Sequence, residues 1–358
     1  MLTSGFSKAQ YLNLLVGTYT QKGSKGIYLY QLDTLNGQLK AISHTDFVSN
    51  PSYLAISKDK QYVYAVNEDE EGSVSAFSLN TQKNKLQFLN QVFTKGAHPC
   101  HISISPDEKN IFVSNYTGGS LTSFYKFADG RISNAQQFIQ HEGSSMHPTR
   151  QTKAHVHGSF FSPNGKYLLV NDLGIDQTKI YPYQLTSNPP LKAAAQVIQA
   201  NPGDGPRHLS FSKNGQRIYI LEELSGTIGV YSFNQGVVKL LQRVSTQSKE
   251  SKDSPGSADI HLSPDGKYIY ASNRGAENNL VQYAIDKNGL LNIASKKHHA
   301  SGGIMPRNFT ISEDGKWLLV ANQASDNIVV FKRDIRTGDL TKMPQSTKVS
   351  MPVCLILF

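Results

Sequence analysis

The sequence predicts an all-β fold, a seven-bladed β-propeller in which each blade has four antiparallel strands. Three features support this: a phrase that recurs six times, a hairpin turn inside each copy, and a C-terminal segment that supplies a strand missing near the N-terminus. Each phrase has a Ser after an apolar residue, then a turn, an aromatic or aliphatic strand and a polar residue. The serines are Ser57, Ser105, Ser162, Ser212, Ser263 and Ser312. Their spacings of 48, 57, 50, 51 and 49 residues are typical of propeller blades.

Each phrase predicts a β-hairpin. The turn after the serine, as in Pro264-Asp265-Gly266, contains Asp, Asn or Gly, which tolerate positive φ. Alternating apolar residues follow, as in residues 268–271. A second pair of strands is expected after each hairpin, for example at residues 73–79 and 86–92. Each unit therefore predicts a four-stranded blade.

The first blade is expected to close the ring. Residues 14–18 and 27–30 supply strands before the first complete repeat, but no innermost strand precedes them. Residues 352–358 have the pattern of the innermost strand at residues 206–212. We therefore expect the C-terminal strand to complete the first blade, which leaves only short edges exposed. Residues 1–358 are predicted to form a single domain.

Composition is typical of a globular protein without membrane spans. Hydrophobic residues make up 38% of the chain and charged residues 18%, and no run approaches the ~20 apolar residues that a spanning helix needs. Residues 1–10 show no long apolar run behind a basic start. The expectation is a cytoplasmic protein with no membrane partner, unless a secretion signal has been removed from the chain.

The net charge of +9 does not predict a nucleic-acid partner. Basic residues are spread over every predicted blade, and no Lys/Arg run is interleaved with aromatic residues. The densest charged stretch, residues 249–253, alternates in sign. Solvated surface is the simplest interpretation. An anionic small molecule remains possible as a ligand.

The cysteines and histidines give weak metal signals. Cys100 and Cys354 cannot form a disulfide framework, and Cys100 lies between His98 and His101 without a further ligand in sequence. The His155-x-His157 pattern would place two imidazoles on one face of a strand, again without a third ligand. No metal and no cofactor are predicted.

Strand topology predicts where chemistry could occur. The innermost strand of each blade begins, and the antiparallel second strand ends, on the same face of the disk. The innermost strands bring Ser52, Tyr53, Cys100, His101, His157, Gly158, Arg207, His208, Ala258, Asp259, Arg307 and Asn308 to that face, and the second strands add Glu68, Tyr116, Asp172, Glu223, Arg274 and Gln323. Two inserts, residues 142–153 and 247–257, are expected on the same face, where loops on a rigid scaffold often carry function.

Structural roles compete with functional ones at several of these positions. The recurrent asparagines at one repeat position indicate a shared hydrogen-bonding role: Asn67, Asn115, Asn273 and Asn322. His208 fits either a core hydrogen bond or the site. Arg207, Arg274 and Arg307 repel one another unless an anion or carboxylates offset their charges, so together they favour anion binding. Glu223 departs from the neutral polar residues near it in the ring.

At these residues the chain resembles the propeller-type 6-phosphogluconolactonase family, which includes fungal carboxy-muconate lactonising enzymes. The resemblance covers essentially the whole chain in order. It is carried by Leu15-Val16-Gly17-Thr18-Tyr19-Thr20, His157, residues 161–174, Gly205-Pro206-Arg207-His208, Glu223-Leu224, Ala258-Asp259-Ile260-His261 and Ser272-Asn273-Arg274.

The resemblance implies a lactone-handling site that works without a metal, because the active-site residues of the lactonising enzymes match His157, Arg207, Glu223 and Arg274. The chain departs from the family pattern at Asn171, where Pro is common, and at Glu222, where Asn is common. Glu222 beside Glu223 leaves open which carboxylate has the acidic role.

The leading hypothesis is hydrolysis of 6-phosphogluconolactone to 6-phosphogluconate in the pentose phosphate route. His157 or Glu223 would act as general base, and Arg207 and Arg274 would contact the carbonyl oxygen and the substrate anion. The remaining substrate-binding candidates are Arg307 and His208, as phosphate contacts, with His101 and Asp259.

Two alternatives stay open. One is a lactonising or isomerising enzyme, or a lactonase, that acts on another carboxylated substrate, whose carboxylates the same arginines would bind. The other is a non-catalytic propeller scaffold that binds partners on its faces.

Overall fold

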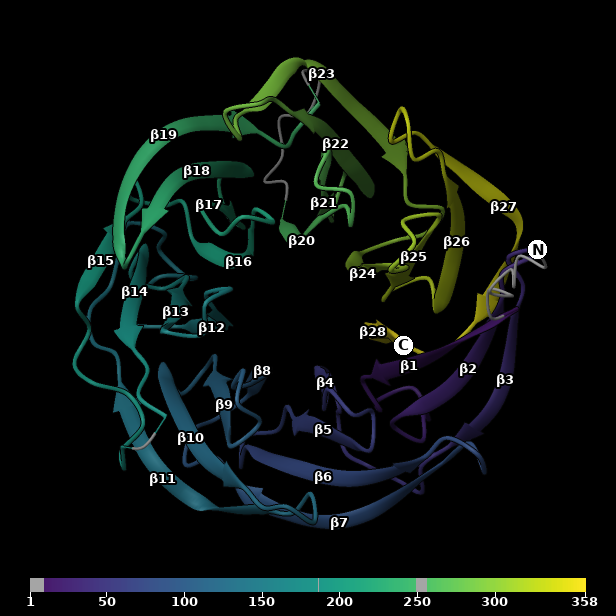
Figure 1. The fold of residues 1–358 in the computed structure, drawn as a ribbon, viewed down its shortest axis with the longest axis horizontal. Coiled ribbons are helices and arrows are strands. Elements are labelled where there is room, and N and C mark those ends of the chain that lie inside the picture. Colours follow the sequence, from purple (N-terminus) through teal and green to yellow (C-terminus); the bar gives the residue numbers. More distant parts are fainter. Residues whose placement is uncertain (1–9, 186, 249–255) are drawn as a thin grey trace, which may run out of the picture.

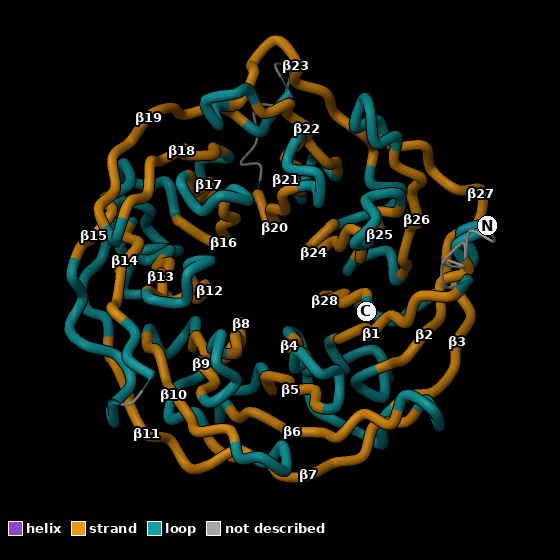
Figure 2. Tube along the Cα trace, in the orientation of Figure 1, coloured by secondary structure: helices purple, strands orange, loops and turns teal. Residues whose placement is uncertain are grey.

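A computed structural model describes residues 10–185, 187–248 and 256–358. These residues form seven four-stranded antiparallel sheets arranged as blades around a central axis (Figures 1 and 2). No α-helix occurs in the described part of the chain. The predicted all-β, seven-bladed architecture is therefore confirmed.

Each blade is an antiparallel meander from an innermost to an outermost strand. The strands from the axis outward are, in blade 1, β28 (Pro352–Leu357), β1 (Tyr11–Thr18), β2 (Tyr28–Asp33) and β3 (Leu39–His44); in blade 2, β4 (Leu54–Ile56), β5 (Tyr62–Asn67), β6 (Ser73–Asn80) and β7 (Lys85–Phe93); in blade 3, β8 (Pro99–Ile104), β9 (Asn110–Asn115), β10 (Ser120–Lys126) and β11 (Ile132–Gln140); and in blade 4, β12 (Val156–Phe161), β13 (Tyr167–Asp172), β14 (Gln177–Pro182) and β15 (Gln196–Gln199).

The last three blades repeat this order. They contain, in blade 5, β16 (Pro206–Phe211), β17 (Arg217–Glu222), β18 (Thr227–Asn234) and β19 (Val237–Ser245); in blade 6, β20 (Ser257–Leu262), β21 (Tyr268–Asn273), β22 (Asn279–Ile285) and β23 (Leu291–Ala300); and in blade 7, β24 (Pro306–Ile311), β25 (Trp317–Asn322), β26 (Asn327–Arg333) and β27 (Leu340–Lys348).

The C-terminal strand closes the ring as predicted. β28 pairs antiparallel with β1, with Leu15 opposite Ile356 and Val16 opposite Leu355. Both ends of the chain thus contribute to blade 1, which ties the first blade to the last (Figure 1). That residues 1–358 act as one domain stays a prediction.

The recurrent serine stabilises the hairpin turn of its blade. In blade 6 the Ser263 hydroxyl accepts a hydrogen bond from the Tyr268 amide at 3.0 Å and donates one to Asp265 Oδ1 at 2.5 Å. The same pair of bonds recurs at the other five serines. The third turn residue has positive φ in all six copies, including Lys60 and Glu108, where no Gly relieves the strain.

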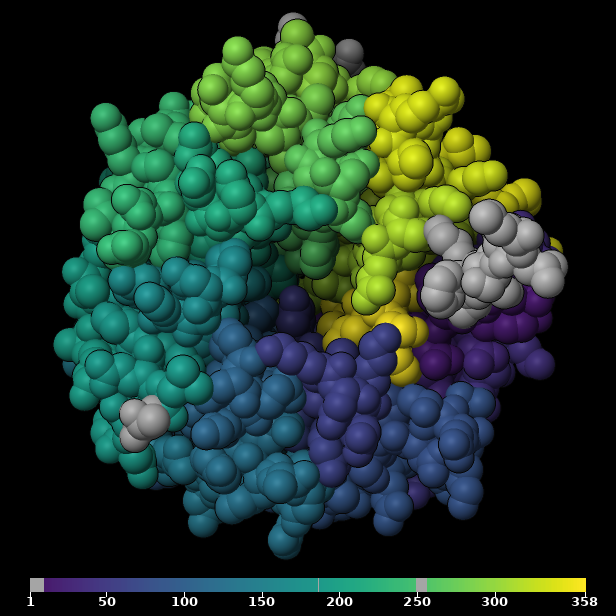
Figure 3. All heavy atoms as spheres, in the orientation of Figure 1, coloured from purple at the N-terminus to yellow at the C-terminus, as the bar shows by residue number. Residues whose placement is uncertain are grey.

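Apolar side chains pack between neighbouring blades. Leu14 and Val16 of blade 1 pack with Trp317 and Leu319 of blade 7, and all four are at most 5% exposed. Similar clusters join the other blades. Figure 3 shows the blades closing around a hollow at the centre of the ring. Within the described ranges no helix is long and apolar enough to cross a membrane.

A bulge at the start of the innermost strands positions the site. The pairing register shifts between Pro99 and His101, Val156 and Gly158, Pro206 and His208, Ser257 and Ile260, and Pro306 and Asn308. A bulge leaves an extra residue unpaired and changes the direction of its side chain. His157, Arg207 and Arg307 are such residues, on blades 4, 5 and 7.

Candidate active site

The carboxylate of Glu223 lies at the centre of a cluster of arginines. Glu223 follows the last residue of β17, and its side chain is only 3% exposed. Its Oε2 atom is 3.0 Å from Arg207 Nε and 3.1 Å from Arg274 Nη2. His157 Nε2 is 3.9 Å from the same oxygen. The structure thus brings together the four residues that the sequence analysis singled out as catalytic, while their roles stay predictions.

A fifth residue, Arg150, completes the cluster and was missed in the sequence analysis. Its Nη2 donates to Glu223 Oε1 at 2.6 Å and to Tyr116 Oη at 3.0 Å. Arg150 belongs to the insert at residues 142–153, so the long repeat spacing identified the loop but not the side chain. The next residue, Gln151, is fully buried and its Nε2 donates to Leu173 O and Asp176 Oδ1. The insert is therefore anchored next to Arg150.

Charge is strongly unbalanced around Glu223. Burial opposes ionisation of this carboxyl, but Arg274, Arg207 and Arg150 hold the pKa of Glu223 far below its usual value. Burial lowers the pKa of Arg274 to about 10, even though Glu223 favours its charged form. Burial, followed by the charge of Arg307, also lowers the pKa of Arg207. Glu223 is therefore a permanent anion that neutralises part of a larger positive charge.

Both buried arginines are fixed by backbone carbonyls as well as by Glu223. Arg207 Nη1 donates to the carbonyl of Ala258, and Arg274 Nε donates to Gly256 O at 2.6 Å. Each guanidinium therefore has a defined orientation before any ligand binds. Preorganised donors of this kind can stabilise negative charge that develops on a substrate oxygen.

His157 is positioned as a neutral imidazole beside Glu223. Only 4% of the residue is exposed, and its ring packs edge-on against Tyr116 and His208 with centroid distances of 5.4 and 5.5 Å. Burial, followed by the charge of Arg207, lowers the pKa of His157 well below its ordinary value. A neutral imidazole can accept a proton. His157 can therefore act as a base without first losing a proton.

His208 contacts both Asp259 and His101 next to the arginine cluster. His208 Nδ1 is 2.8 Å from Asp259 Oδ1, and Asn308 Nδ2 donates to Asp259 Oδ2 at 2.5 Å. The His101 ring lies 4.4 Å from Tyr53 and 5.4 Å from His208, measured between centroids. Burial and the charge of Arg207 lower the pKa of His208 to about 4. These three predicted substrate-binding residues form a buried polar layer, and their contact with substrate stays a prediction.

Arg307 lies apart from the carboxylate of Glu223. Its guanidinium carbon is 5.4 Å from the centroid of the Tyr19 ring. The Tyr19 hydroxyl donates to Glu68 Oε2 at 2.8 Å, so residues that follow the second strands of blades 1 and 2 meet at this end of the channel. Within the described ranges, neither a hydrogen bond nor an ion pair joins Arg307 to another side chain.

Asp172 was expected in the ring, and that prediction is wrong. Asp172 is fully buried. It accepts one hydrogen bond from the His155 amide at 2.7 Å and another from His141 Nδ1 at 2.8 Å. It is the last residue of β13, whereas Glu223 and Arg274 lie one residue beyond the ends of their strands. Because side chains alternate along a strand, this one-residue difference turns Asp172 into the blade.

The structure also separates the two adjacent glutamates of blade 5. Glu222 occupies the position of Asp172, is fully buried and lies 2.5 Å from Arg243 Nη2. Burial raises the pKa of Glu222 to about 7. Since Arg243 also binds Asp204 at 2.5 Å, Glu222 belongs to a cluster inside the blade. Of the pair, only Glu223 contacts the arginines of the channel.

The recurrent asparagines have the shared structural role that was predicted. Asn67 Nδ2 donates to Ser49 O at 2.6 Å, Asn273 Nδ2 to Thr246 O at 2.9 Å and Asn322 Nδ2 to Ser301 O at 3.3 Å. Asn115 Nδ2 instead donates to the hydroxyls of Ser120 and Thr122. The first three bonds join the end of a second strand to the loop that enters its blade from the preceding blade, and those of Asn115 reach the third strand of its own blade.

Two further expectations concern metals and loops. The rings of His155 and His157 both contact Tyr116, but across the described ranges no group of three or more His, Cys, Asp or Glu side chains is arranged to hold a metal ion.

The charged stretch at residues 249–253 and most of the insert at residues 247–257 lie outside the described residues.

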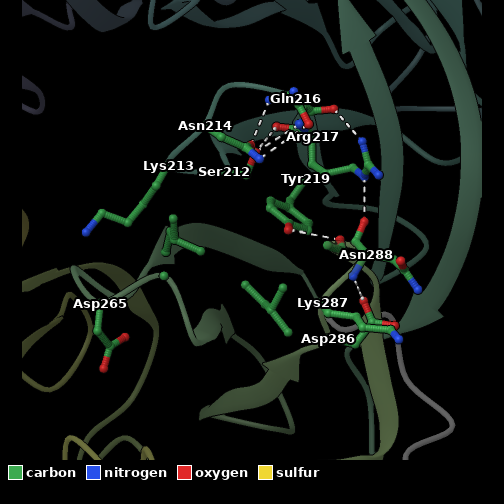
Figure 4. Close-up of a pocket in the computed structure, with 14 residues that line it drawn as sticks. Ser212, Lys213, Asn214, Gln216, Arg217, Tyr219, Asp265, Asp286, Lys287 and Asn288 are labelled. Atoms are coloured by element: carbon green, nitrogen blue, oxygen red, sulfur yellow. Dashed lines mark hydrogen bonds between the residues drawn. The ribbon is translucent and has the colours of Figure 1, made fainter.

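A pocket of about 310 Å³ lies at the opposite ends of the strands (Figure 4). It is lined by the turn after β16, including Lys213 and Asn214, and by the turn between β22 and β23, including Asp286 and Asn288. Arg217 in its wall already donates to Asn288 O at 2.8 Å. This pocket is distinct from the arginine cluster, which lies where the innermost strands begin.

The fold and the site together define a seven-bladed propeller whose channel contains a buried arginine–glutamate–histidine cluster. The sequence model of the family described as "Lactonase, 7-bladed beta-propeller" matches residues 13–357. The chain therefore belongs to this lactonase family.

Individual relatives agree with this assignment. A 6-phosphogluconolactonase of Formosa agariphila is 38% identical over 96% of this chain and 99% of its own, and one of Bacillus subtilis is 32% identical over 95% and 96%. A crystal structure of a putative 6-phosphogluconolactonase from Bacteroides fragilis has a TM-score of 0.93 at 38% identity and covers 99% of both chains. The periplasmic gluconolactonase PpgL of Pseudomonas aeruginosa has a TM-score of 0.91 at 36% identity, covering 97% of this chain and 99% of its own.

Proposed function

We propose that this protein hydrolyses 6-phosphogluconolactone to 6-phosphogluconate at the Glu223 cluster. The observation that carries the proposal is the convergence of three arginines on one buried carboxylate beside a neutral histidine. Lactone hydrolysis needs a base for water and donors for the developing oxyanion, and this cluster contains both. The names of the Formosa agariphila and Bacillus subtilis relatives support the same reaction.

His157 is the general base in this proposal. It takes a proton from water as the water oxygen attacks the lactone carbonyl carbon. The imidazolium that forms faces Glu223 Oε2, 3.9 Å away in the resting site, which stabilises the new positive charge. Glu223 is a poorer candidate because Arg150, Arg207 and Arg274 already engage both of its carboxylate oxygens. Its role is to position those arginines.

Arg207 and Arg274 stabilise the oxyanion in this scheme. Negative charge on the carbonyl oxygen is met by guanidinium groups that Glu223 and backbone carbonyls already orient. When the tetrahedral intermediate collapses, the ring C–O bond breaks and the leaving alkoxide takes the proton from His157. Water and side chains alone account for these steps. The product is an open-chain hydroxy acid whose new carboxylate remains among the arginines.

A coupled assay tests the proposal. Production of 6-phosphogluconate is followed with 6-phosphogluconate dehydrogenase, after subtraction of spontaneous lactone opening. We expect His157→Asn to lower the catalysed rate by roughly 10²- to 10³-fold with the fold intact. His44→Asn in the outermost strand of blade 1 is the matched control and should retain the wild-type rate. A wild-type rate no faster than spontaneous opening would refute the function.

For the binding partner and the cellular location, the proposal is limited to broad classes. The substrate is an anionic lactone, and neither nucleic acid nor membrane is part of the proposal. A cytoplasmic location stays a prediction, while the related protein of Pseudomonas aeruginosa is described as periplasmic.

A further inference from the structure

Asp176 joins two loops beside the candidate active site. It is the last residue before β14 and is 1% exposed. Its Oδ1 accepts hydrogen bonds from Gln151 Nε2 and from the Gly205 amide, both at 2.7 Å. Its Oδ2 accepts a third from the Gly203 amide at 2.8 Å. One carboxylate thus ties the insert at residues 142–153 to the loop that enters blade 5.

Both loops carry residues of the arginine cluster. Arg150 directly precedes the glutamine that contacts Asp176. Arg207 lies two residues after Gly205, whose carbonyl also accepts a hydrogen bond from the Glu223 amide at 2.8 Å. The chain segments that carry Arg150, Arg207 and Glu223 therefore meet at or next to this carboxylate.

Blades 6 and 7 make the same contact with the blade that follows them. In each, the last residue before the third strand accepts the amide of the residue before the next innermost strand. The pairs are Asp176 with Gly205 at 2.7 Å, Asn278 with Met305 at 2.7 Å and Asp326 with Met351 at 2.9 Å. Because Asn278 uses an amide oxygen, this repeated contact between blades does not require a carboxylate.

The turn at Asp176 does not require a side chain either. Its φ is 55°, in the left-handed region that favours glycine. Gly119 and Gly226 hold the same position in blades 3 and 5, with φ of 60° and 65°. An Asp tolerates this conformation better than most residues, but at a higher cost than glycine. Contacts of the Asp176 side chain must therefore compensate that cost.

Contacts with the insert distinguish Asp176 from Asp326 of blade 7. Asp326 Oδ2 pairs with Lys22 at 3.2 Å, and these two side chains are 35% and 51% exposed. Asp176 instead accepts from Gln151, which is fully buried, and from two backbone amides. A buried carboxylate with three donors holds its neighbours more firmly than a solvated ion pair does.

We propose that Asp176 is a positioning residue, which fixes the insert so that Arg150 can hold Oε1 of Glu223. The Arg150 side chain is 40% exposed, so it would otherwise be free to turn to water. An anchor at the next residue removes much of this freedom before a substrate arrives. Asp176 thus acts on the reaction through Arg150. The inference rests on the proposed lactonase function and concerns how the site of that reaction is held in place.

Two substitutions break the connection at its two ends. Gln151→Met keeps a long unbranched side chain but removes the donor to Asp176. Asp176→Gly introduces the residue that blades 3 and 5 have in this turn. Each should lower kcat/KM for 6-phosphogluconolactone by about three- to tenfold, up to the loss caused by Arg150→Ala. The loss should appear in the same parameter, kcat or KM, as it does in Arg150→Ala.

Double variants show whether the effect passes through Arg150. In the Arg150→Ala background neither substitution should lower kcat/KM further, because the side chain that they position is gone. A further loss of about threefold or more would overturn the inference, since Asp176 would then act on the site by another route. Unchanged kcat/KM in the folded single variants would overturn it as well.

Asp326→Gly is the matched control. It removes an aspartate from the same turn of blade 7, together with its contact to Met351, on the other side of the ring from the insert (Figure 1). It should leave kcat/KM within about twofold of wild type. Melting curves verify that each variant is folded, and if Asp176→Gly is not, Gln151→Met decides alone.

Hydrogen–deuterium exchange separates this inference from the proposed function, because it does not depend on turnover. Amides of residues 142–153 should exchange faster in Gln151→Met and Asp176→Gly than in wild type, and at the wild-type rate in Asp326→Gly. Unchanged exchange in the first two variants of an active protein would refute the inference and leave the lactonase function standing. Faster exchange in a protein that hydrolyses no 6-phosphogluconolactone would refute the proposed function and leave Asp176 as the anchor of the insert.

Discussion

Substitution of Glu223 by Gln removes one negative charge and almost no volume. In the wild-type protein, Oε2 accepts a hydrogen bond from Arg207 and forms an ion pair with Arg274, and the two arginine side chains are 3% and 12% exposed. Oε1 accepts from Arg150, whose side chain is 40% exposed. The neutral amide leaves the two buried guanidinium groups without their counter-ion, while Arg150 can turn to water.

The expected loss of stability follows from this burial. Removal of one partner from a buried ion pair costs about 3–5 kcal/mol, whereas an exposed pair such as that of Arg150 contributes only about 0–1 kcal/mol. At about 2.1 cal/mol/K per residue, unfolding 358 residues has an entropy of roughly 0.75 kcal/mol/K. A loss of about 4 kcal/mol therefore lowers Tm by roughly 5 °C.

The pH dependence of this effect has a definite sign. The folded-state pKa of Glu223 is lowered by the arginines, so its contribution is fully present above the unfolded pKa of about 4.3. It is lost only as pH falls through the lower folded pKa. The difference in Tm between wild type and Glu223→Gln should thus be constant from pH 8 to pH 5.

Thermal denaturation by circular dichroism or calorimetry measures the difference. Glu71→Gln, at an exposed position, is the control and should unfold with the wild-type protein. The lactonase rate of Glu223→Gln should fall at least about 10²-fold because the oxyanion donors lose their orientation. A Tm within 1 °C of wild type across this pH range would refute the view that Glu223 neutralises buried arginines.

Three further predictions concern neighbouring residues. Arg150→Ala should lower kcat/KM about tenfold with a small change in Tm, since its side chain is 40% exposed; steady-state kinetics with melting curves check this. Glu222→Gln should keep a near-wild-type kcat. Because the folded pKa of Glu222 is about 7, the wild-type protein loses stability from pH 5 to pH 8. Urea unfolding should therefore show that the stability of the variant improves relative to wild type over that range. For His208, the folded pKa of about 4 lies below the unfolded value near 6.5, so stability falls by roughly 3 kcal/mol as pH drops between them, a slope that His208→Gln should reduce in urea titrations.

The ring could be predicted because its determinants are local and repeated. Each serine makes its hydrogen bonds within five residues, so the hairpin is encoded in a short segment that appears six times. The missing strand of blade 1 was visible because residues 352–358 share the pattern of an innermost strand. Local patterns of this kind need no knowledge of distant contacts.

The site was predictable only in part, because its contacts cross between blades. Arg150 reaches Glu223 over 73 positions in sequence, and no periodic signal marks its side chain in an irregular insert. Asp172 was misplaced because a single residue of register decides whether a side chain faces the channel or the blade. By the same alternation, Glu222 faces the inside of the blade and Glu223 faces the channel. Their adjacent positions in the sequence do not show this difference.

The charge balance of the channel bears on the proposed catalysis. Glu223 compensates Arg207 and Arg274, so both guanidinium groups are oriented before a substrate arrives. In the proposed reaction they therefore need no rearrangement when negative charge develops on the carbonyl oxygen. This is why the loss of one buried carboxylate is expected to change both the stability of the ring and the rate of the reaction.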